Sequence, residues 1–266
     1  MIEAVTLDFG NTLVPVPAAG LHAVVADTAR AMAVGLGPFD TDAVLRLWGE
    51  ERARQFREEV PQFREVDLAQ RIARILARLR GMAPPLPDER WDDLAAAALS
   101  DPAEVAWVID VSSRGFVTAL PPAPGVTGLL ARLALHHRLA ILSNWPLAAT
   151  IDRYVEAAGW SPSLVAVVVS QRVGTIKPHP AIFAAARDAL GDPPPEAILH
   201  VGDDWAADIV GAKKAGWRAA YLASRPDDSP LPGSDRDGDV VPDLELAALS
   251  DLEPALARLE AGLARR

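Results

Sequence analysis

Six polar side chains along the sequence share one feature: each lies after a short apolar run. They are Asp8, Ser143, Asn144, Lys177, Asp203 and Asp208. A carboxylate can act as a nucleophile, and a lysine can offset charge between that nucleophile and a phosphate group. Mg²⁺ prefers one or two carboxylates together with waters and phosphate oxygens, which Asp8, Asp203 and Asp208 could supply. These residue types together predict a phosphoryl-transfer site.

Each of these residues also has an ordinary structural interpretation when it is taken alone. Asp8 could cap a turn, Asp204 could be the N-cap of the helix that follows it, and Lys177 could be a solvated loop cation. Strand ends are normally polar, which favours those interpretations one by one. Four such groups at four strand ends instead favour a common site.

The apolar runs before these groups are typical of buried strands. Strands are expected over residues 4–7, 138–142, 165–169, 198–201 and 218–222. Helices are expected between them, over residues 125–136, 146–158, 180–190 and 204–215, with a last amphipathic helix over 251–263. Apolar strands that alternate with helices predict an α/β fold with a parallel, doubly wound sheet. In such a sheet the ligand crevice lies at the carboxyl ends of the strands, where these polar groups are.

A helical insertion is expected directly after the first strand. It has a proline-containing loop over 14–20, helices over 21–36, 41–59, 67–80, 88–99 and 102–109, and a proline-rich hinge over 120–124. The predicted boundaries are 1–14 and 122–266 for the core, and 15–121 for the insertion. The insertion is rich in arginines interleaved with glutamates, which predicts solvated helix faces, with one or two arginines able to reach a substrate. They are Arg46, Arg52, Arg54, Arg57, Arg64, Arg71, Arg74, Arg78 and Arg80.

Composition narrows the classes of partner. The 266 residues carry a net charge of −10, which argues against nucleic-acid or anionic-membrane partners but allows a small anionic substrate. There is no cysteine, so disulfides and thiolate metal sites are excluded. No apolar stretch approaches the ~20 residues of a membrane span, and the first residues lack a basic region, so a cytoplasmic location is expected. Residues 224–240 are rich in Asp, Pro, Gly and Ser and predict an exposed loop.

The order and spacing of four motifs resemble the haloacid dehalogenase-like hydrolase superfamily. The motifs are DFGNTL from Asp8, SN from Ser143, KPHPAIF from Lys177, and VGDDWAADIVGAKKAG from Val201. The resemblance covers nearly the whole chain, and the last two motifs are highly specific. It implies a Rossmann-like core, and the position of the helical insertion is similar to that of the small α-helical cap of one subfamily.

The resemblance also implies roles for individual residues. Asp8 would be the nucleophile that forms an aspartyl-phosphate, with Ser143 and Lys177 as the other catalytic residues. Mg²⁺ would be held by Asp8, Asp203, Asp208 and the backbone carbonyl of Gly10. Substrate binding would involve Asn144, Gly10 and Asn11, while Thr12 would support the loop of the first motif. The other candidates to line the cleft are His22, His179, Trp145 and Trp205.

One position departs from the pattern of the family's phosphatases. These usually carry a second Asp, two residues after the nucleophile, as general acid and base, and that position here is Gly10. The family's dehalogenases also lack that Asp, but they usually lack the acidic metal pair that Asp203 and Asp208 would form. The favoured hypothesis is therefore a Mg²⁺-dependent phosphohydrolase acting on a small phosphorylated metabolite. The alternatives are a 2-haloacid dehalogenase that uses Asp8, or a phospho-ligand-binding member of the fold with weak turnover. The oligomeric state and the substrate are not predicted.

Overall fold

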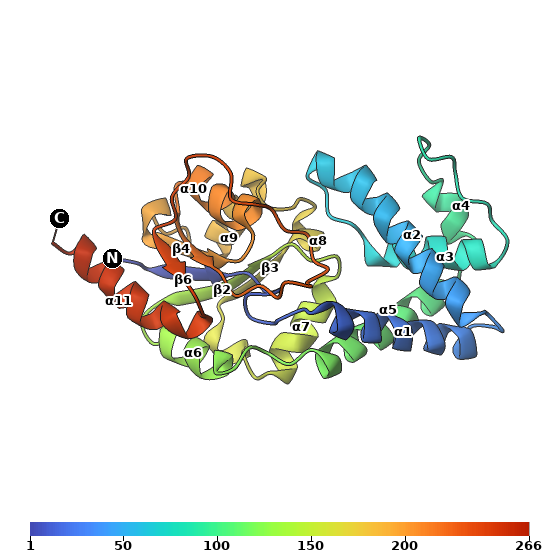
Figure 1. Ribbon diagram of the computed structural model, residues 1–266, viewed down its shortest axis with the longest axis horizontal. Coiled ribbons are helices and arrows are strands. Elements are labelled where there is room, and N and C mark those ends of the chain that lie inside the picture. Colours follow the sequence, from blue (N-terminus) through green and yellow to red (C-terminus); the bar gives the residue numbers. More distant parts are fainter. Residues whose placement is uncertain (266) are drawn as a thin grey trace.

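The computed structural model describes residues 1–265 and contains one parallel sheet (Figure 1). Its six strands lie in the order β3-β2-β1-β4-β5-β6, so the sheet is wound in both directions from β1. The strands are β1 (Ala4–Leu7), β2 (Arg138–Ser143), β3 (Ala166–Val169), β4 (Ile198–Gly202), β5 (Arg218–Leu222) and β6 (Leu244–Leu246). The five predicted strands and the predicted fold class are confirmed, while β6 was not expected. The place where the strand order reverses, next to β1, is where ligands bind in such sheets.

The strand register brings the predicted site groups to one level of the sheet. Leu7 pairs with Ile141 of β2 on one side and with Val201 of β4 on the other. The backbone N–H of Asp8 then donates to the carbonyl of Val201 at 2.8 Å. The three central strands therefore end together, and the residues after them meet at one edge.

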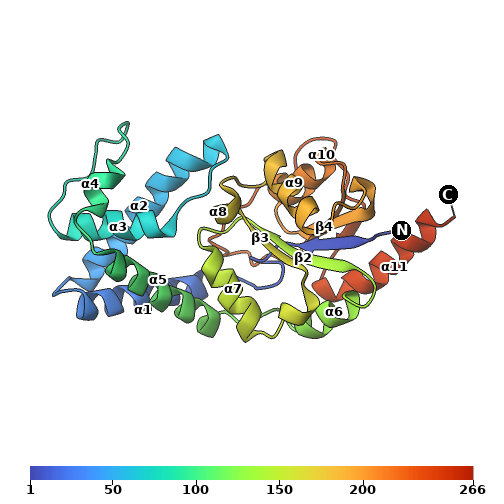
Figure 2. The same ribbon diagram turned by 180° about the vertical axis from the view of Figure 1, so that it is seen from behind.

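Helices cover both faces of the sheet (Figures 1 and 2). On one face lie α6 (Val126–Leu133), α7 (Ala148–Ala157) and α11 (Leu252–Leu263), and on the other α8 (Ser170–Val173), α9 (Pro180–Ala189), the π-helical turn η4 (Trp205–Val210) and α10 (Gly211–Lys214). Successive side chains of a strand point to opposite faces of the sheet. Val5 and Leu7 of β1 pack in the apolar core on one face, while Ala140 and Leu142 of β2, each one position beyond the residue that pairs with Val5 or Leu7, pack in the core on the other face. Short 3₁₀ turns lie at Val60–Gln62, Ser161–Ser163, Pro195–Ala197 and Leu249–Asp251.

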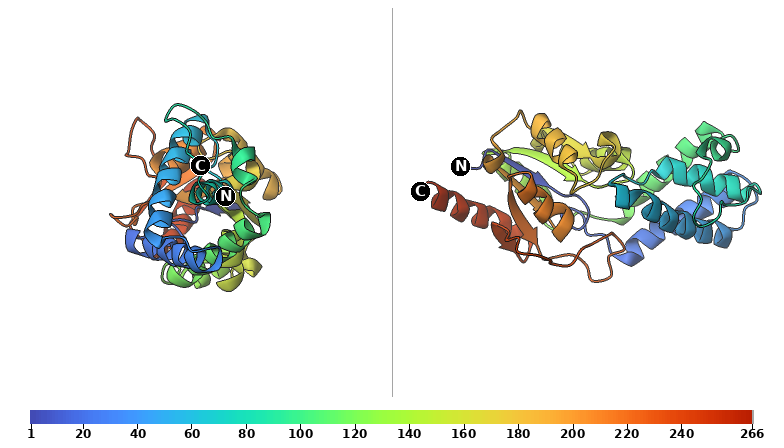
Figure 3. Two further views of the ribbon diagram at one scale, coloured as in Figure 1. Left: turned by 90° about the vertical axis from the view of Figure 1, so that its right-hand side faces the viewer. Right: turned by 90° about the horizontal axis from the view of Figure 1, so that it is seen from above.

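Five helices between β1 and β2 form a helical unit beyond the carboxyl edge of the sheet (Figure 3). They are α1 (Ala18–Gly35), α2 (Thr41–Glu59), α3 (Leu68–Leu79), α4 (Asp93–Ala97) and α5 (Pro102–Ala119). The four helices α2 to α5 each follow an Asp whose side chain accepts a hydrogen bond from a backbone N–H of the first turn. The apolar faces of α1, α2, α3 and α5 bury a cluster that includes Met32, Trp48, Ile72 and Val108. The helix expected over 88–99 is shorter than predicted, and the one expected over 102–109 runs on to Ala119.

The prediction that the arginines of this unit lie on solvated faces is wrong for three of them. Arg54, Arg71 and Arg74 are buried. Arg74 pairs with Asp93 of α4 at 2.7 Å and with Glu58 of α2 at 3.5 Å, so a buried cation joins α3 to both helices instead of facing solvent. In the described part of the chain, no helix combines the length and the apolar character needed to cross a membrane.

Candidate active site

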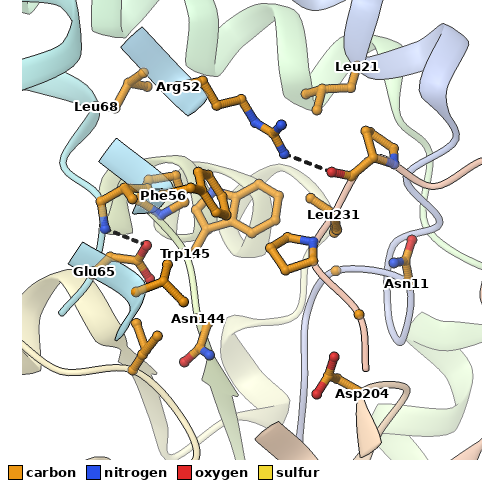
Figure 4. Close-up of a pocket in the computed structure, with 18 of the residues that line it drawn as sticks. Asn11, Leu21, Arg52, Phe56, Glu65, Leu68, Asn144, Trp145, Asp204 and Leu231 are labelled. Carbon is orange, nitrogen blue, oxygen red and sulfur yellow. Dashed lines mark hydrogen bonds between the residues drawn. The ribbon is translucent and has the colours of Figure 1, made fainter. Parts of the chain in front are cut away.

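A cavity of about 740 Å³ lies between the helical unit and the carboxyl ends of the strands (Figure 4). Seven residues predicted from the sequence line it: Asp8, Gly10, Asn11, Asn144, Lys177, Asp203 and Asp208. Ser143 does not line the cavity. Its hydroxyl lies buried at the end of β2 and has no hydrogen-bond partner among residues 1–265. The structure therefore brings together the predicted residues that follow β1 and β4 and the loop that carries Lys177. Ser143 lies behind the wall of the cavity.

Lys177 is the cation at the centre of the site. Its Nζ donates to Asp8 Oδ1 at 2.8 Å, to Asp208 Oδ1 at 2.6 Å and to the carbonyl of Leu142 at 2.8 Å. Only 3% of Lys177 is exposed, so the interpretation as a solvated loop cation is wrong. Burial by itself would lower the pKa of Lys177, but the two carboxylates raise it above its usual value, and the lysine stays charged.

Asn144 holds the loop that carries Lys177 in position. Its Oδ1 accepts from the backbone N–H of Lys177 at 2.7 Å, and its Nδ2 donates to the Lys177 carbonyl at 3.0 Å. The amide that was expected to help bind substrate is therefore engaged with backbone. Since both hydrogen bonds reach the residue that carries the ammonium group, Asn144 fixes where that charge stands.

Asp8, Asp203 and Asp208 each place a carboxylate oxygen within 4.8 Å of the other two. Burial raises the pKa of Asp8, and burial together with the other two acids raises the pKa of Asp203 to about 8. Burial also acts on Asp208, but Lys177 and His200 outweigh it and hold the pKa of Asp208 well below its usual range. Lys177 and Arg225, whose Nη1 lies 3.3 Å from Asp203 Oδ2, face these three acids, so the fully ionised acids exceed the two cations by one negative charge. Oxygens bound to Mg²⁺ lie about 2.1 Å from the ion, hence within roughly 4.2 Å of each other, so the triad fits such a cation after a small contraction.

A buried histidine behind the acids was missed in the sequence. His200 Nε2 lies 3.0 Å from Asp208 Oδ1, and its Nδ1 lies 2.8 Å from the hydroxyl of Thr6. With Nε2 protonated, His200 donates to Asp208 and accepts from Thr6. The available signal was a histidine within an otherwise aliphatic strand, which alone does not indicate a site.

The segment after β5 crosses the site. The predicted exposed loop over 224–240 is confirmed for residues 232–239, while residues 225, 226 and 229–231 are half-buried. Ser229 Oγ accepts from the side-chain amide of Asn11 at 3.0 Å, and Ser234 Oγ donates to Asp204 at 2.9 Å. Arg225 Nη1 lies 3.3 Å from Asp203 Oδ2. These hydrogen bonds and this ion pair attach the segment to Asn11, Asp203 and Asp204. The composition of the segment could not reveal this attachment.

Asp203 and Asp204 also make hydrogen bonds to residues outside the segment after β5. Asp204 is an N-cap, as its ordinary interpretation predicted, because it accepts from the backbone N–H of Ala207 at 2.7 Å. The Thr12 hydroxyl reaches Asp203 Oδ1 at 3.4 Å, so Thr12 supports the fourth motif as well as its own loop.

Gly10 is packed under the crossing segment. A Cβ added there would lie 2.6 Å from Leu231 Cδ1 and 3.2 Å from the ring of Trp145. Gly10 does not have a positive φ, whereas its neighbour Asn11 has φ 59°. Close packing, rather than a conformation reserved for glycine, therefore explains the glycine. Leu231 occupies the space that a side chain at position 10 would need.

The other candidates for the cleft divide evenly. Trp145 lines the cavity, and so does His22, which is exposed on α1. His179 instead caps α9 by accepting from the backbone N–H of Ala181 at 3.2 Å, and it does not line the cavity. Trp205 packs in the core on the far side of the acids and also stays outside. Figure 4 shows Arg52, Phe56 and Leu21 on the other wall, which the helical unit supplies.

A parallel sheet wound from β1, an aspartate at the end of that strand, and a lysine held between two acids define a class of enzyme. A model of the haloacid dehalogenase-like hydrolase family matches residues 2–216, and the chain belongs to that family. It is therefore a hydrolase.

Known relatives include both phosphatases and dehalogenases. The chain is 28% identical over 150 residues to pyrimidine 5'-nucleotidase YjjG of Escherichia coli, an alignment that spans 55% of this chain and 63% of the relative. It is 36% identical over 104 residues to the phosphoserine phosphatase of Thermus thermophilus, over 38% of this chain and 41% of that protein. Both alignments cover less than two thirds of the relative. The crystal structure of a 2-haloacid dehalogenase from Pseudomonas syringae superimposes with a TM-score of 0.67 at 25% identity, covering 97% of this chain and 99% of that one.

Proposed function

We propose that this hydrolase is a Mg²⁺-dependent phosphatase of a small phosphorylated metabolite, with Asp8 as nucleophile. The observation that carries the proposal is the buried triad Asp8, Asp203 and Asp208, whose oxygens lie within 4.8 Å of one another beside a single lysine. The three acids outnumber Lys177 and Arg225, which leaves negative charge that a divalent ion would neutralise. A dehalogenation that uses only Asp8 gives no reason for Asp203 to be there.

The reaction would proceed in two displacements at phosphorus. An Asp8 oxygen attacks phosphorus, the bond from phosphorus to the leaving oxygen breaks, and that oxygen keeps the electron pair. The leaving oxygen takes its proton from solvent or from the substrate, because Gly10 offers none. Water then attacks phosphorus and loses a proton to solvent, the bond from phosphorus to Asp8 breaks with the electron pair returning to the carboxylate, and inorganic phosphate departs.

The residues around Asp8 have separate tasks in this proposal. Lys177 holds Asp8 Oδ1 and offsets its charge as the phosphoryl group approaches. The Ser143 hydroxyl lies behind the cavity wall without a partner among residues 1–265, and it would bind a phosphoryl oxygen by turning toward the cavity. Mg²⁺ would be held by Asp8, Asp203 and Asp208 with the Gly10 carbonyl, and when bound it supplies positive charge at the phosphoryl oxygens.

We also propose that residues 15–121 act as a cap over a core of residues 1–14 and 122–266. Support comes from the cavity, because helices of this unit supply one wall and the strand ends supply the other. The partner is a small phosphorylated molecule that fits this space, without a nucleic acid or a membrane.

Dehalogenation of a 2-haloacid is the second candidate. The likeness to a 2-haloacid dehalogenase at 25% identity favours it, as does Gly10 in place of a general acid. In that reaction Asp8 would displace halide from carbon, and no divalent ion would be needed.

A paired assay separates the two candidates. Phosphate release is measured over a broad panel of phosphorylated metabolites with Mg²⁺, beside halide release from 2-haloacids, each with and without a chelator. We expect phosphate release that the chelator and Asp8→Asn both abolish. Halide release that survives the chelator, with no phosphoester cleaved, would establish the dehalogenase instead.

A further inference from the structure

The arginines of the helical unit fall into two groups. Nine of them lie within ion-pair distance of a carboxylate: Arg30, Arg46, Arg54, Arg64, Arg74, Arg78, Arg80, Arg90 and Arg114. Arg57 is exposed. Arg52 and Arg71 differ, because both line the cavity and neither has a carboxylate within 4.0 Å in residues 1–265. Arg57 also lacks an ion-pair partner, but it does not line the cavity, so Arg52 and Arg71 are the unpaired arginines that face the site.

Arg71 is the more deeply placed of the two. It lies on α3, is 5% exposed, and donates from Nε to Gln55 Oε1 at 2.9 Å. That is its only side-chain hydrogen bond within residues 1–265. The end of the guanidinium, which carries most of its donors, therefore remains available to a molecule in the cavity.

Arg52 stands beside it on α2. Its Nη2 donates to the carbonyl of Pro230 at 2.7 Å, and its guanidinium lies over the ring of Phe56 at 4.7 Å from the ring centre (Figure 4). Both contacts hold the cation in place and neither neutralises it. Burial lowers the pKa of Arg52, and burial together with Arg52 lowers the pKa of Arg71 to about 10, so both stay charged at neutral pH.

The one acid in the same wall does not serve as their partner. Glu65 lines the cavity, but one of its oxygens accepts from the Ser170 hydroxyl and the other from the backbone N–H of Val66 at 2.9 Å. Burial raises the pKa of Glu65, which further reduces its value as a counter-ion. The charges of Glu65, Asp67 and Glu51 act on Arg71 and raise its pKa, but none of these acids pairs with it. A buried cation without an ion-pair partner is costly to a fold, so Arg71, with the half-buried Arg52 beside it, indicates an anionic ligand in the cavity.

The walls between these arginines and the strand ends are apolar. They include Leu21, Trp48, Phe56, Leu68, Trp145 and Leu147. A volume of about 740 Å³ is far larger than a phosphate group alone requires and is in the range that holds an aromatic metabolite. The part of the substrate between its two charged ends is thus expected to be apolar.

We propose that Arg52 and Arg71 form an anion site on the helical side of the cavity, which selects phosphate esters of apolar or aromatic carboxylic acids. The phosphoryl group lies at Asp8, the carboxylate lies at the two guanidinium groups, and the apolar walls hold the body of the substrate. This inference rests on the proposed phosphatase function for its catalytic part, whereas the anion site itself stands on the arginines.

The catalytic test uses aryl phosphates with a carboxylate on arms of increasing length, each beside its neutral carboxamide isostere. Because the contact is charge-assisted and bidentate, we expect the kcat/KM of the wild type for the best carboxylate to exceed that for its carboxamide isostere by about 10- to 100-fold. Arg52→Met should remove most of that preference, with a much larger fall in kcat/KM for the carboxylate than for the carboxamide. Arg46→Met, an exposed arginine on the same helix, is the matched control and should keep it. An equal loss for both substrates in Arg52→Met would overturn the selective role.

A binding test separates this inference from the proposed function. Calorimetry measures the affinity of the dephosphorylated aryl carboxylic acid and of its amide for the wild type, Arg52→Met and Arg71→Gln, with no catalysis required. Arg71→Lys keeps the charge if Arg71→Gln fails to fold. A preference for the acid that both arginine variants reduce supports the anion site, even if no phosphate is ever released and the phosphatase proposal fails. Equal affinity of the wild type for acid and amide overturns the anion site, whatever the enzyme hydrolyses.

Discussion

At the scale of single residues, Lys177 decides the electrostatics of the site. It is the only lysine within hydrogen-bond reach of both Asp8 and Asp208 in residues 1–265. A buried charge pair that loses one partner costs about 3–5 kcal/mol, since the remaining charge is left in a poorly solvated place. The same ammonium group stands where charge would build up during phosphoryl transfer.

Lys177→Met is expected to cut turnover by about 10²–10³-fold, the usual cost of removing one aligned donor at a reacting centre. It should also lower the free energy of unfolding, measured by urea titration, with partial recovery in Mg²⁺. Lys214→Met, an exposed lysine of the same motif, is the control and should change neither quantity. Turnover near that of the wild type in Lys177→Met would remove the basis for grouping these residues as one site.

In the proposed phosphatase, Gly10 would set how strongly the rate of hydrolysis depends on the leaving group. A general acid typically contributes 10²–10⁴-fold, and more as the leaving group becomes more basic. The double variant Gly10→Asp, Leu231→Ala is expected to speed the hydrolysis of alkyl phosphates more than that of 4-nitrophenyl phosphate. The second substitution is needed because Leu231 Cδ1 lies 2.6 Å from the new Cβ. A folded, Mg²⁺-binding double variant whose ratio of the two rates is unchanged would show that the proton comes from another group.

At the scale of elements, the ends of β1 and β4 fix the acids, and β5 and β6 fix the segment that crosses them. Asp243 begins the return of that segment into the sheet. It accepts from Lys213 at 2.8 Å, from Arg218 at 3.0 Å and from the backbone N–H of Ala219 at 3.0 Å. Burial would raise the pKa of Asp243, but these hydrogen bonds outweigh it and the pKa is lowered.

The pKa of Asp243 is lower in the folded state than in the unfolded state. Its contribution to the free energy of unfolding is therefore present at neutral pH and is lost as pH falls through the folded-state pKa. Asp243→Asn should therefore lower the free energy of unfolding by about 1–2 kcal/mol at neutral pH, allowing for partial exposure. The difference from the wild type should shrink progressively below pH 3.8, the ordinary Asp value. Urea titrations over a pH series measure it, with the exposed Asp239→Asn as control. A difference that stays constant down to strongly acidic pH would contradict the assigned ion pairs.

Sequence pattern was enough for most elements and for the acids and the lysine. Strand ends are set by local apolar runs, so Asp8 and Asp203 could be placed from spacing, while Lys177, which follows β3 and α8, depended on the motif that resembles the family. His200 and Leu231 could not, because their roles depend on which distant segments meet them. Strand β6 was missed since its three residues follow a long polar segment and gain their apolar partner only from β5.

At the scale of the whole molecule, two units and one crossing segment share the cavity. The sheet supplies the reactive groups and the helical unit supplies apolar walls and two cations. The segment after β5 joins them, since the Pro230 carbonyl accepts from Arg52 at 2.7 Å and Asp228 accepts from the backbone N–H of Ala18 at 3.3 Å. The substrate would therefore be recognised by groups from all three parts.

The most direct measurement asks whether Asp8 becomes phosphorylated. The enzyme is mixed with Mg²⁺ and an aryl phosphate, quenched in acid during turnover, reduced with borohydride, digested and analysed by mass spectrometry. An aspartyl-phosphate at position 8 would be converted to homoserine, and we expect that product in the wild type and neither in Asp8→Asn nor with a chelator. Phosphate release at the wild-type rate by Asp8→Asn, with no homoserine at position 8 of the wild type, would contradict the role of Asp8 as nucleophile.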